Sequence, residues 1–270
     1  MTAPETTAES LSPVSRTALA VARVRALESE RPDALFNDPY AGAFVAAARY
    51  TRGTPGPFAA ALRFRSVIRT RFYDDYLLAA CAAGCRQVVL PAAGLDTRAY
   101  RLPWPEGVRL YELDLPPVLA FKEGVLAGQD ARPRCERITL AVDLLAQEWP
   151  GLLAEAGFDP AAPTAWLAEG LLVYLTAAQA SAFLGTVGEL SAPGSRLALE
   201  QGRSSTGAAS DPSLAHITGL WHGGLGPGTG DWLREHGWLV ETHELGPLAV
   251  RYGRTGTGPA GGGFHTAIRP

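Results

Sequence analysis

The feature that most constrains the fold of this sequence is a regular alternation, from residue 86 onward, of short apolar segments with longer amphipathic ones. The short segments have the length of buried strands, and the longer ones have the length and composition of helices. Strands that alternate with helices form a parallel sheet covered on both faces. We therefore predict an α/β fold with strands at Gln87–Ala92, Arg109–Asp114, Arg137–Val142, Ala165–Ala168 and Arg196–Glu200.

Helices are predicted between these strands and at both ends of the chain. The intervening helices are expected at Pro117–Ala127, Ala146–Ala156 and Ala177–Leu190. After a Gly- and Ser-rich segment that begins at residue 202, the pattern predicts a helix near Asp231–His236 and two strands, Leu239–Glu244 and Phe264–Arg269. This C-terminal pair fits an antiparallel edge on an otherwise parallel sheet.

The N-terminal third is predicted to be helical. Residues 1–13 are expected to be a disordered tail, followed by helices at Ser15–Ser29, Pro39–Arg49 and Ala59–Ala83, the last one capped by Gly84. We predict a single domain, residues 14–270, in which residues 14–83 form a helical lid over a core formed by residues 84–270.

Composition excludes several classes of partner. Hydrophobic residues make up 47% of the chain and the formal net charge is −3, so a substantial core is expected and a basic face for nucleic acid or an anionic membrane is not. We find neither a signal peptide nor an apolar run of about 18 residues, and expect a cytoplasmic protein. The three cysteines, Cys81, Cys85 and Cys135, lack metal-ligand spacing and are interpreted as structural thiols, so no metal is expected.

A loop of small residues and a following acid provide the main chemical signal. The first predicted strand runs into Ala92-Ala93-Gly94-Leu95-Asp96, where small side chains let backbone N–H groups approach a ligand at the carboxyl edge of the sheet. About 20 residues later the second strand ends at Asp114, a position where a carboxylate accepts hydrogen bonds from ribose hydroxyls. Glu112 is the alternative acid, and a tight turn without a ligand is the alternative interpretation of the loop.

Several separated motifs, in order along the chain, resemble the leucine carboxyl methyltransferase family, in particular its actinobacterial branch of S-adenosylmethionine-dependent O-methyltransferases. The resemblance runs from about Val14 to the C-terminus. It rests on Arg31-Pro32-Asp33, Phe36-Asn37-Asp38-Pro39-Tyr40-Ala41, Arg69-Thr70-Arg71-Phe72-Tyr73-Asp74-Asp75, Ala93-Gly94-Leu95-Asp96-Thr97-Arg98-Ala99-Tyr100-Arg101-Leu102, Asp143-Leu144, residues 166–175 and residues 193–200.

The resemblance implies a class I methyltransferase, Rossmann-like sheet that binds S-adenosylmethionine. By this resemblance Arg69, or alternatively Arg71, pairs with the methionine carboxylate, and Asp114 holds the ribose. Asp143 and Leu144 flank the adenine, and Glu169 faces the cofactor. Each of these carboxylates could instead cap a helix, above all Asp143. Many methyltransferases have glycine at the position of Ala92, which leaves Gly94 as the one glycine of this loop.

The methyl acceptor is expected to be a small molecule with a carboxylate or hydroxyl group, from specialised metabolism. Candidate acceptor-site residues are His216, Trp221, His222 and Tyr40, although structural roles for the histidines and core packing of Trp221 are alternatives. Tyr40 is assigned to the lid together with Phe44. The sequence identifies no general base and no oligomeric state. A protein C-terminal carboxylate as acceptor and a non-catalytic cofactor-binding protein are the rival interpretations, and a nicotinamide-dependent oxidoreductase is disfavoured because the three-glycine pattern is missing.

Overall fold

The computed structural model describes residues 11–49, 57–201, 219–255 and 262–270, and their strands form one seven-stranded sheet of order β3-β2-β1-β4-β5-β7-β6. The strands are β1 Gln87–Pro91, β2 Arg109–Asp114, β3 Glu136–Ala141, β4 Thr164–Ala168, β5 Arg196–Glu200, β6 Leu239–Glu244 and β7 Gly263–Ile268. The pairs from β3 to β5 are parallel, whereas β7 is antiparallel to both β5 and β6. The predicted α/β class, with its antiparallel C-terminal edge, is confirmed.

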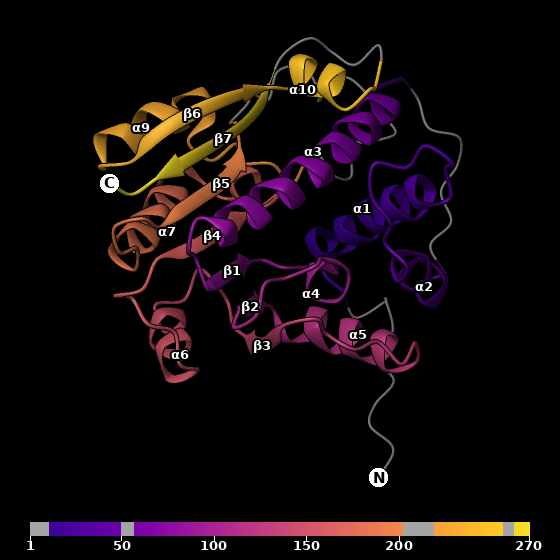
Figure 1. Cartoon of the computed structure of the whole chain (residues 1–270), viewed down its shortest axis with the longest axis horizontal. Helices are drawn as coiled ribbons and strands as arrows, with labels where there is room; N and C mark the ends of the chain where they lie inside the picture. The colour runs from indigo at the N-terminus through magenta and orange to yellow at the C-terminus, as the bar shows by residue number, and fades with distance from the viewer. Residues whose placement is uncertain (1–10, 50–56, 202–218, 256–261) are drawn as a thin grey trace.

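The helices surround this sheet (Figure 1). They are α1 Pro13–Ser29, α2 Ala41–Ala47, α3 Pro57–Ala82, α4 Arg98–Arg101, α5 Pro116–Ala127, α6 Trp149–Glu155, α7 Ala177–Glu189, α9 Thr229–Glu235 and α10 Leu245–Arg251, with single 3-10 turns η2 Leu172–Tyr174 and η5 Gly226–Gly228. The sequence did not predict α4 or α10. Residues 245–247, Leu-Gly-Pro, are typical of a turn, but proline is tolerated in the first turn of a helix, and Leu248 and Ala249 then pack into the core.

The core has two layers, one on each face of the sheet. Alternate residues of β1 point to opposite faces, so Val88 and Leu90 join the layer covered by α3, α5 and α10, while Val89 joins the layer covered by α6, α7 and α9. All five residues of β1 are buried, as expected for a central parallel strand. In Figure 1 α3 crosses one face of the sheet, and α1 and α2 lie together beyond its edge.

Among the described residues no helix is long and apolar enough to cross a membrane.

Cys81, Cys85 and Cys135 are free thiols, and burial raises the pKa of Cys81 to about 11. Gly84 has a φ of +110°, the left-handed conformation expected for the residue that ends α3.

Candidate functional site

A cavity of about 720 Å³ lies where the carboxyl ends of the parallel strands meet the N-terminal helices. Its walls are the loops that follow β1, β2, β3 and β4, together with residues of α1 and α3. Open parallel sheets bind ligands at this edge, and the volume lies in the range of small-molecule and cofactor pockets. The fold therefore places the candidate ligand loop and the candidate acids around one space.

The loop after β1 is joined directly to the acid that ends β2. The backbone N–H of Gly94 donates to Asp114 Oδ2 over 2.6 Å, and the N–H of Leu115 donates to Oδ1 over 2.7 Å. Burial raises the pKa of Asp114, against these two backbone donors, which lower it. A carboxylate oxygen accepts more than one hydrogen bond, so each oxygen of Asp114 has room for a further donor such as a hydroxyl.

Glu112, the alternative acid, is placed differently. Its side chain is fully buried, and its Oε2 accepts from Lys122 Nζ and from Arg137 Nη2, each over 2.6 Å. It does not line the cavity, whereas Asp114 does.

Two residues of the loop have left-handed backbone. Gly94 has a φ of +52°, and a Cβ added there would lie 3.4 Å from the Cβ of Ala18 on α1. Ala92 has a φ of +54°, although it has a side chain. The alanine therefore adopts the conformation for which glycine is usually selected, and the chain reverses after β1 without a second glycine.

The two candidate arginines of α3 have different surroundings. Arg69 lines the cavity; its Nε lies 2.9 Å from Glu169 Oε1, and its Nη1 donates to Glu200 Oε1 over 2.9 Å. Burial alone would lower the pKa of Arg69, but Glu169 and Glu200 raise it above its usual value.

Arg71 lies outside the cavity lining. It donates to Asp75 and to the carbonyl of Leu35, and its guanidinium lies over the ring of Tyr252. Of the two arginines only Arg69 can meet a ligand in this cavity.

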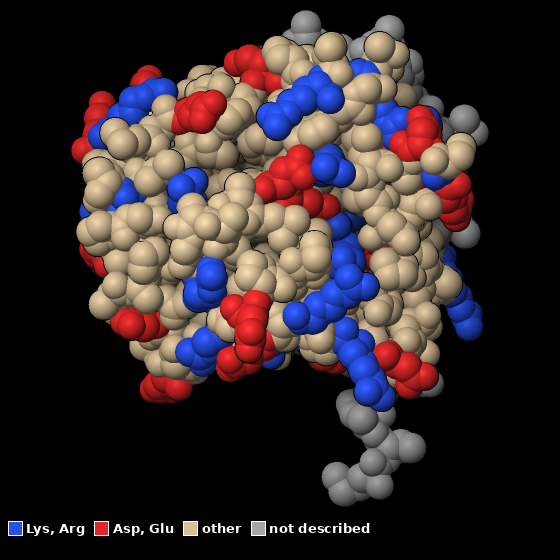
Figure 2. Space-filling view, in the orientation of Figure 1, with Lys and Arg blue, Asp and Glu red and all other residues tan. Residues whose placement is uncertain are grey.

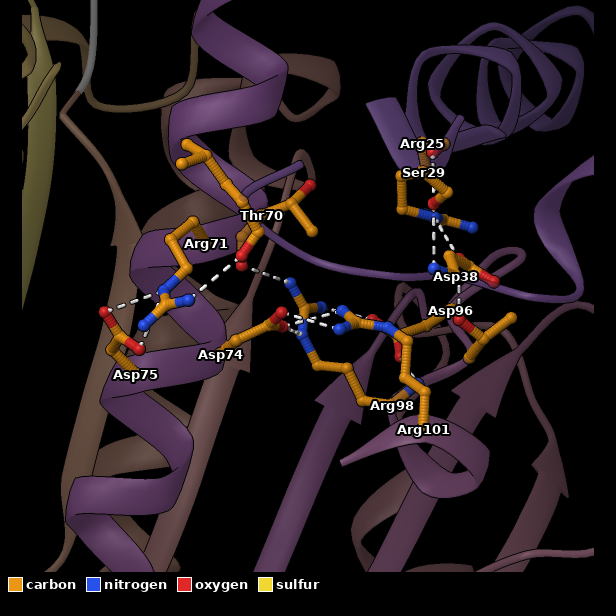
Figure 3. Close-up of polar contacts among 12 residues, drawn as sticks. Arg25, Ser29, Asp38, Thr70, Arg71, Asp74, Asp75, Asp96, Arg98 and Arg101 are labelled. Carbon is orange, nitrogen blue, oxygen red and sulfur yellow. Dashed lines mark hydrogen bonds and ion pairs between the residues drawn. The ribbon is translucent and has the colours of Figure 1, made fainter. Parts of the chain in front are cut away.

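Arg98 lies at the centre of a buried ionic network with Asp74 and Asp96 (Figure 3), and Glu169 also pairs with it. The guanidinium of Arg98 donates to Glu169 Oε2 over 2.8 Å, to Asp74 over 2.7 Å, and to Asp96. Burial opposes ionisation of Asp96, yet Arg98 outweighs it and lowers the pKa to about 2. The pKa of Glu169 is also lowered, because Arg69 and Arg98 outweigh its burial. Asp96 and Glu169 therefore line the cavity as paired, ionised carboxylates.

The loop after β3 supplies Asp143 and Leu144 to the cavity. The carboxylate of Asp143 accepts from the N–H of Leu145 over 2.9 Å, and α6 begins only at Trp149, so this acid closes a local turn and does not cap the helix. Asp143 is exposed and Leu144 is half-buried. The two residues therefore offer a ligand one polar and one apolar side chain next to each other in the cavity wall.

The candidate acceptor residues are distributed unevenly. Trp221 lines the cavity, and its loop is fixed because the N–H groups of His222, Gly223 and Gly224 donate to carbonyls of residues 173 and 175. His222 is exposed and does not line the cavity. Tyr40 packs edge-on against Tyr100, with ring centroids 5.6 Å apart, also away from the cavity.

His216 lies outside the described residues. The other predicted lid residue, Phe44, is fully buried in the core, whereas α1 and α3 of the predicted lid both contribute residues to the cavity lining.

Several residues of this site were not identified from the sequence. Asp38 accepts from Arg25 of α1 over 2.7 Å and from Thr97 over 2.7 Å, and thus fastens α1 to the loop after β1. Tyr174 lines the cavity, and its hydroxyl donates to Thr17 over 3.1 Å. Asp38, Thr97 and Tyr174 stand inside the motifs, which was an available signal, whereas Arg25 and Thr17 stand outside them.

The residues around the cavity fit a nucleoside cofactor with an amino-acid tail. Asp114 can accept from ribose hydroxyls beside the small Gly94 loop, and Asp143 and Leu144 can contact a base. Arg69 can also hold a carboxylate, since its ion pairs engage Nε and Nη1 and not Nη2. The described residues contain no group of three or more His, Cys, Asp or Glu side chains arranged to hold a metal ion.

Comparison with known proteins assigns the family. The model of the leucine carboxyl methyltransferase family matches residues 18–188. A protein of Parafrankia sp. (strain EAN1pec), named as a candidate S-adenosyl-L-methionine-dependent methyltransferase, is 48% identical over 95% of this chain and 87% of its own length. A Streptomyces coelicolor protein with the same kind of name is 47% identical over 88% of this chain and 87% of its own length.

Solved structures agree at the level of the fold. A DUF574 family protein from Streptomyces avermitilis superposes with a TM-score of 0.60 at 15% identity, covering 94% of this chain and 97% of its own. Magnesium protoporphyrin IX methyltransferase from Synechocystis PCC 6803, solved with bound SAH, superposes with a TM-score of 0.53 at 14% identity, covering 93% of this chain and 100% of its own.

The sheet order is that of the class I methyltransferase fold. The family match and the relatives of 47–48% identity show that the chain is an S-adenosylmethionine-dependent methyltransferase. Within that class, the chain belongs to the leucine carboxyl methyltransferase family. The family expected from the motifs is thereby confirmed.

Proposed function

We propose that this protein transfers the methyl group of S-adenosylmethionine to an oxygen atom of a small-molecule acceptor. The observation that carries the proposal is the continuity of one cavity from Asp114 and the Gly94 loop, past Arg69 and Glu169, to Tyr174 and Trp221. This continuity supports the proposal, because a single space offers room for the cofactor at one end and for the acceptor at the other.

The bound cofactor supplies an activated methyl group, so the protein has mainly to align the acceptor and exclude water. Asp114 accepts from the ribose, and Arg69 holds the carboxylate tail. Helix α1 covers the Gly94 loop, because Arg25 and Asp38 fasten it there, and thereby shields the site from solvent.

The surroundings of the acceptor end favour an oxygen that ionises without help. Glu169 is held by Arg69 and Arg98 and its pKa is lowered, so it is a weak base, and no histidine lines the cavity among the described residues. A carboxylate acceptor needs no general base, and an acidic phenol needs little assistance. These observations support O-methylation of an acidic group.

The first test is methyl transfer from tritiated S-adenosylmethionine to a panel of small carboxylic acids and phenols, with whole-cell protein extract in parallel. We expect label in a small molecule. Label found only in protein would contradict the proposal and favour the protein-carboxylate alternative.

A binding test isolates the cofactor end. Asp114→Ala should weaken binding of S-adenosylhomocysteine by roughly 1.5–3 kcal/mol, because it removes charge-assisted hydrogen bonds to the ribose. Asp75→Asn is the matched control, since Asp75 is a half-exposed carboxylate paired with Arg71 outside the cavity. Equal dissociation constants for Asp114→Ala and the unchanged protein, measured by calorimetry, would show that Asp114 does not hold the ribose.

A further inference from the structure

Charge in the cavity is divided between its two walls. The carboxylates that line it all lie at the carboxyl edge of the sheet, at the end of β2 or in the loops after the strands, namely Asp96, Asp114, Asp143 and Glu169. The cations that line it all come from the helices α1 and α3, namely Arg23, Arg25, Arg63 and Arg69. Neither helix contributes a carboxylate to the described lining.

Two of the four cations already have partners. Arg25 is paired with Asp38 at 2.7 Å, and Arg69 with Glu169 and Glu200, each at 2.9 Å. Arg23 on α1 and Arg63 on α3, in contrast, make no hydrogen bond or ion pair with the described part of the chain. These two helices contact one another, so both guanidinium groups belong to the same helical wall.

The face of the molecule shown in Figure 2 carries acidic side chains beside basic ones, together with a run of basic side chains to the right of its centre. The helical wall has apolar side chains beside its cations, including Val24, Leu27 and Leu62. Arg23 is half-buried and Arg63 is exposed. A cavity wall of one sign, with apolar neighbours, attracts an oppositely charged ligand.

We propose that Arg23 and Arg63 bind an oxyanion of the acceptor that is distinct from the oxygen that is methylated. The acceptor is then an amphipathic small acid with an apolar body and a carboxylate, sulfonate or phosphate group. Arginine suits this role because its planar fork of donors matches such groups. The inference rests on the proposed function, since it assigns the helical wall to the acceptor of the same reaction.

Two fluorescent probes that share an apolar body test the charge requirement. 8-Anilinonaphthalene-1-sulfonate carries an anionic group, and N-phenyl-1-naphthylamine is its neutral counterpart. Both are titrated into the full-length protein saturated with S-adenosylhomocysteine, so that the cofactor end is filled. We expect the sulfonate to bind at least about tenfold more tightly than the neutral probe, the scale of one charge-assisted contact.

Variants then locate the effect. Arg23→Gln combined with Arg63→Gln should weaken the sulfonate about tenfold or more, and leave the neutral probe within about twofold. Arg132→Gln removes an exposed arginine outside the cavity and should change neither probe. Thermal unfolding of each variant shows that the fold is intact, as expected for side chains without partners in the described chain.

The outcomes separate the two proposals. If S-adenosylhomocysteine does not bind the unchanged protein, the proposed function fails and this inference fails with it. If S-adenosylhomocysteine binds and the two probes bind equally, or if the double variant binds the sulfonate as well as the unchanged protein, the anion site is refuted while the methyltransferase proposal stands.

Discussion

At the scale of single residues, Ala92 combines a side chain with a left-handed backbone. This conformation costs an L-residue about 1–2 kcal/mol, so Ala92→Gly should raise the free energy of unfolding by up to about 1 kcal/mol after the added entropy of glycine. Ala93→Gly is the control, because Ala93 is not among the residues with positive φ. This variant should have a free energy of unfolding about 0.5–1 kcal/mol lower than that of the unchanged protein. Urea unfolding measures both. A loss of stability in Ala92→Gly would show that its backbone is not strained.

Arg69 and Arg71 form a second residue-scale comparison, two positions apart on one helix. Arg69→Lys keeps the charge but loses the fork that spans Glu169 and Glu200, so we expect S-adenosylhomocysteine binding to weaken by about tenfold or more. Arg71→Lys should change it by less than about twofold, since Arg71 lies outside the cavity lining and its contacts are partly exposed. The reverse order of effects, measured by calorimetry, would reassign the carboxylate contact.

At the scale of elements, a buried ion pair joins β2 to α5. Lys122 and Glu112 are both fully buried and 2.6 Å apart. Lys122→Met leaves a buried carboxylate with Arg137 alone and should lower the free energy of unfolding by about 3–5 kcal/mol. Glu112→Gln added to Lys122→Met should restore part of the lost stability, because it removes the buried negative charge of Glu112. Arg137 still has Glu123 as an ion-pair partner in this double variant. A double variant less stable than Lys122→Met would contradict this account.

Element boundaries followed local chemistry where the sequence carries it. Helix α7 begins with a capping box, in which Thr176 accepts from the N–H of Gln179 and the side chain of Gln179 accepts from the N–H of Thr176. Helix α6 begins three residues later than predicted, because Asp143 closes a turn with Leu145, and Pro150 lies in the first turn of the helix, where proline is tolerated.

At the scale of the whole molecule, the ionic network around Arg98 makes stability depend on pH. The pKa of Asp96 is lowered to about 2 in the folded protein, so its contribution is complete above its unfolded pKa and is lost as pH falls toward 2. The full effect is about 2 kcal/mol. Asp114, whose pKa is raised, acts in the opposite direction.

We therefore expect the free energy of unfolding to fall between pH 5 and pH 3, and to fall less steeply in Asp96→Asn. The exposed Asp33 would add to this pH dependence, because Arg31 and Arg254 lower its pKa to about 2. The measurement is therefore made at high salt, which screens the charges around Asp33. Urea unfolding at both pH values measures the slope. Equal slopes in the two proteins would exclude Asp96 as a source of the pH dependence.

The sequence by itself determined the α/β class, the positions of all seven strands to within a residue or two, and the family. It also indicated Gly94 and Asp114, which the structure joins by a hydrogen bond. The fold class, the strands and these two residues depend on local patterns: the periodicity of apolar residues, small residues in a turn, and an acid at the end of a strand. Each is recorded in a few consecutive positions. The family was indicated by the resemblance of the motifs.

Only the tertiary structure decided what depends on contacts between distant segments. It placed β7 between β5 and β6, and it brought Arg69 together with Glu169 and Glu200. It also placed the cavity against the side of α3 that carries Arg69 and not Arg71. The charged helical wall of the cavity likewise exists only once α1 and α3 are packed, because no local pattern specifies which distant side chains will share a space.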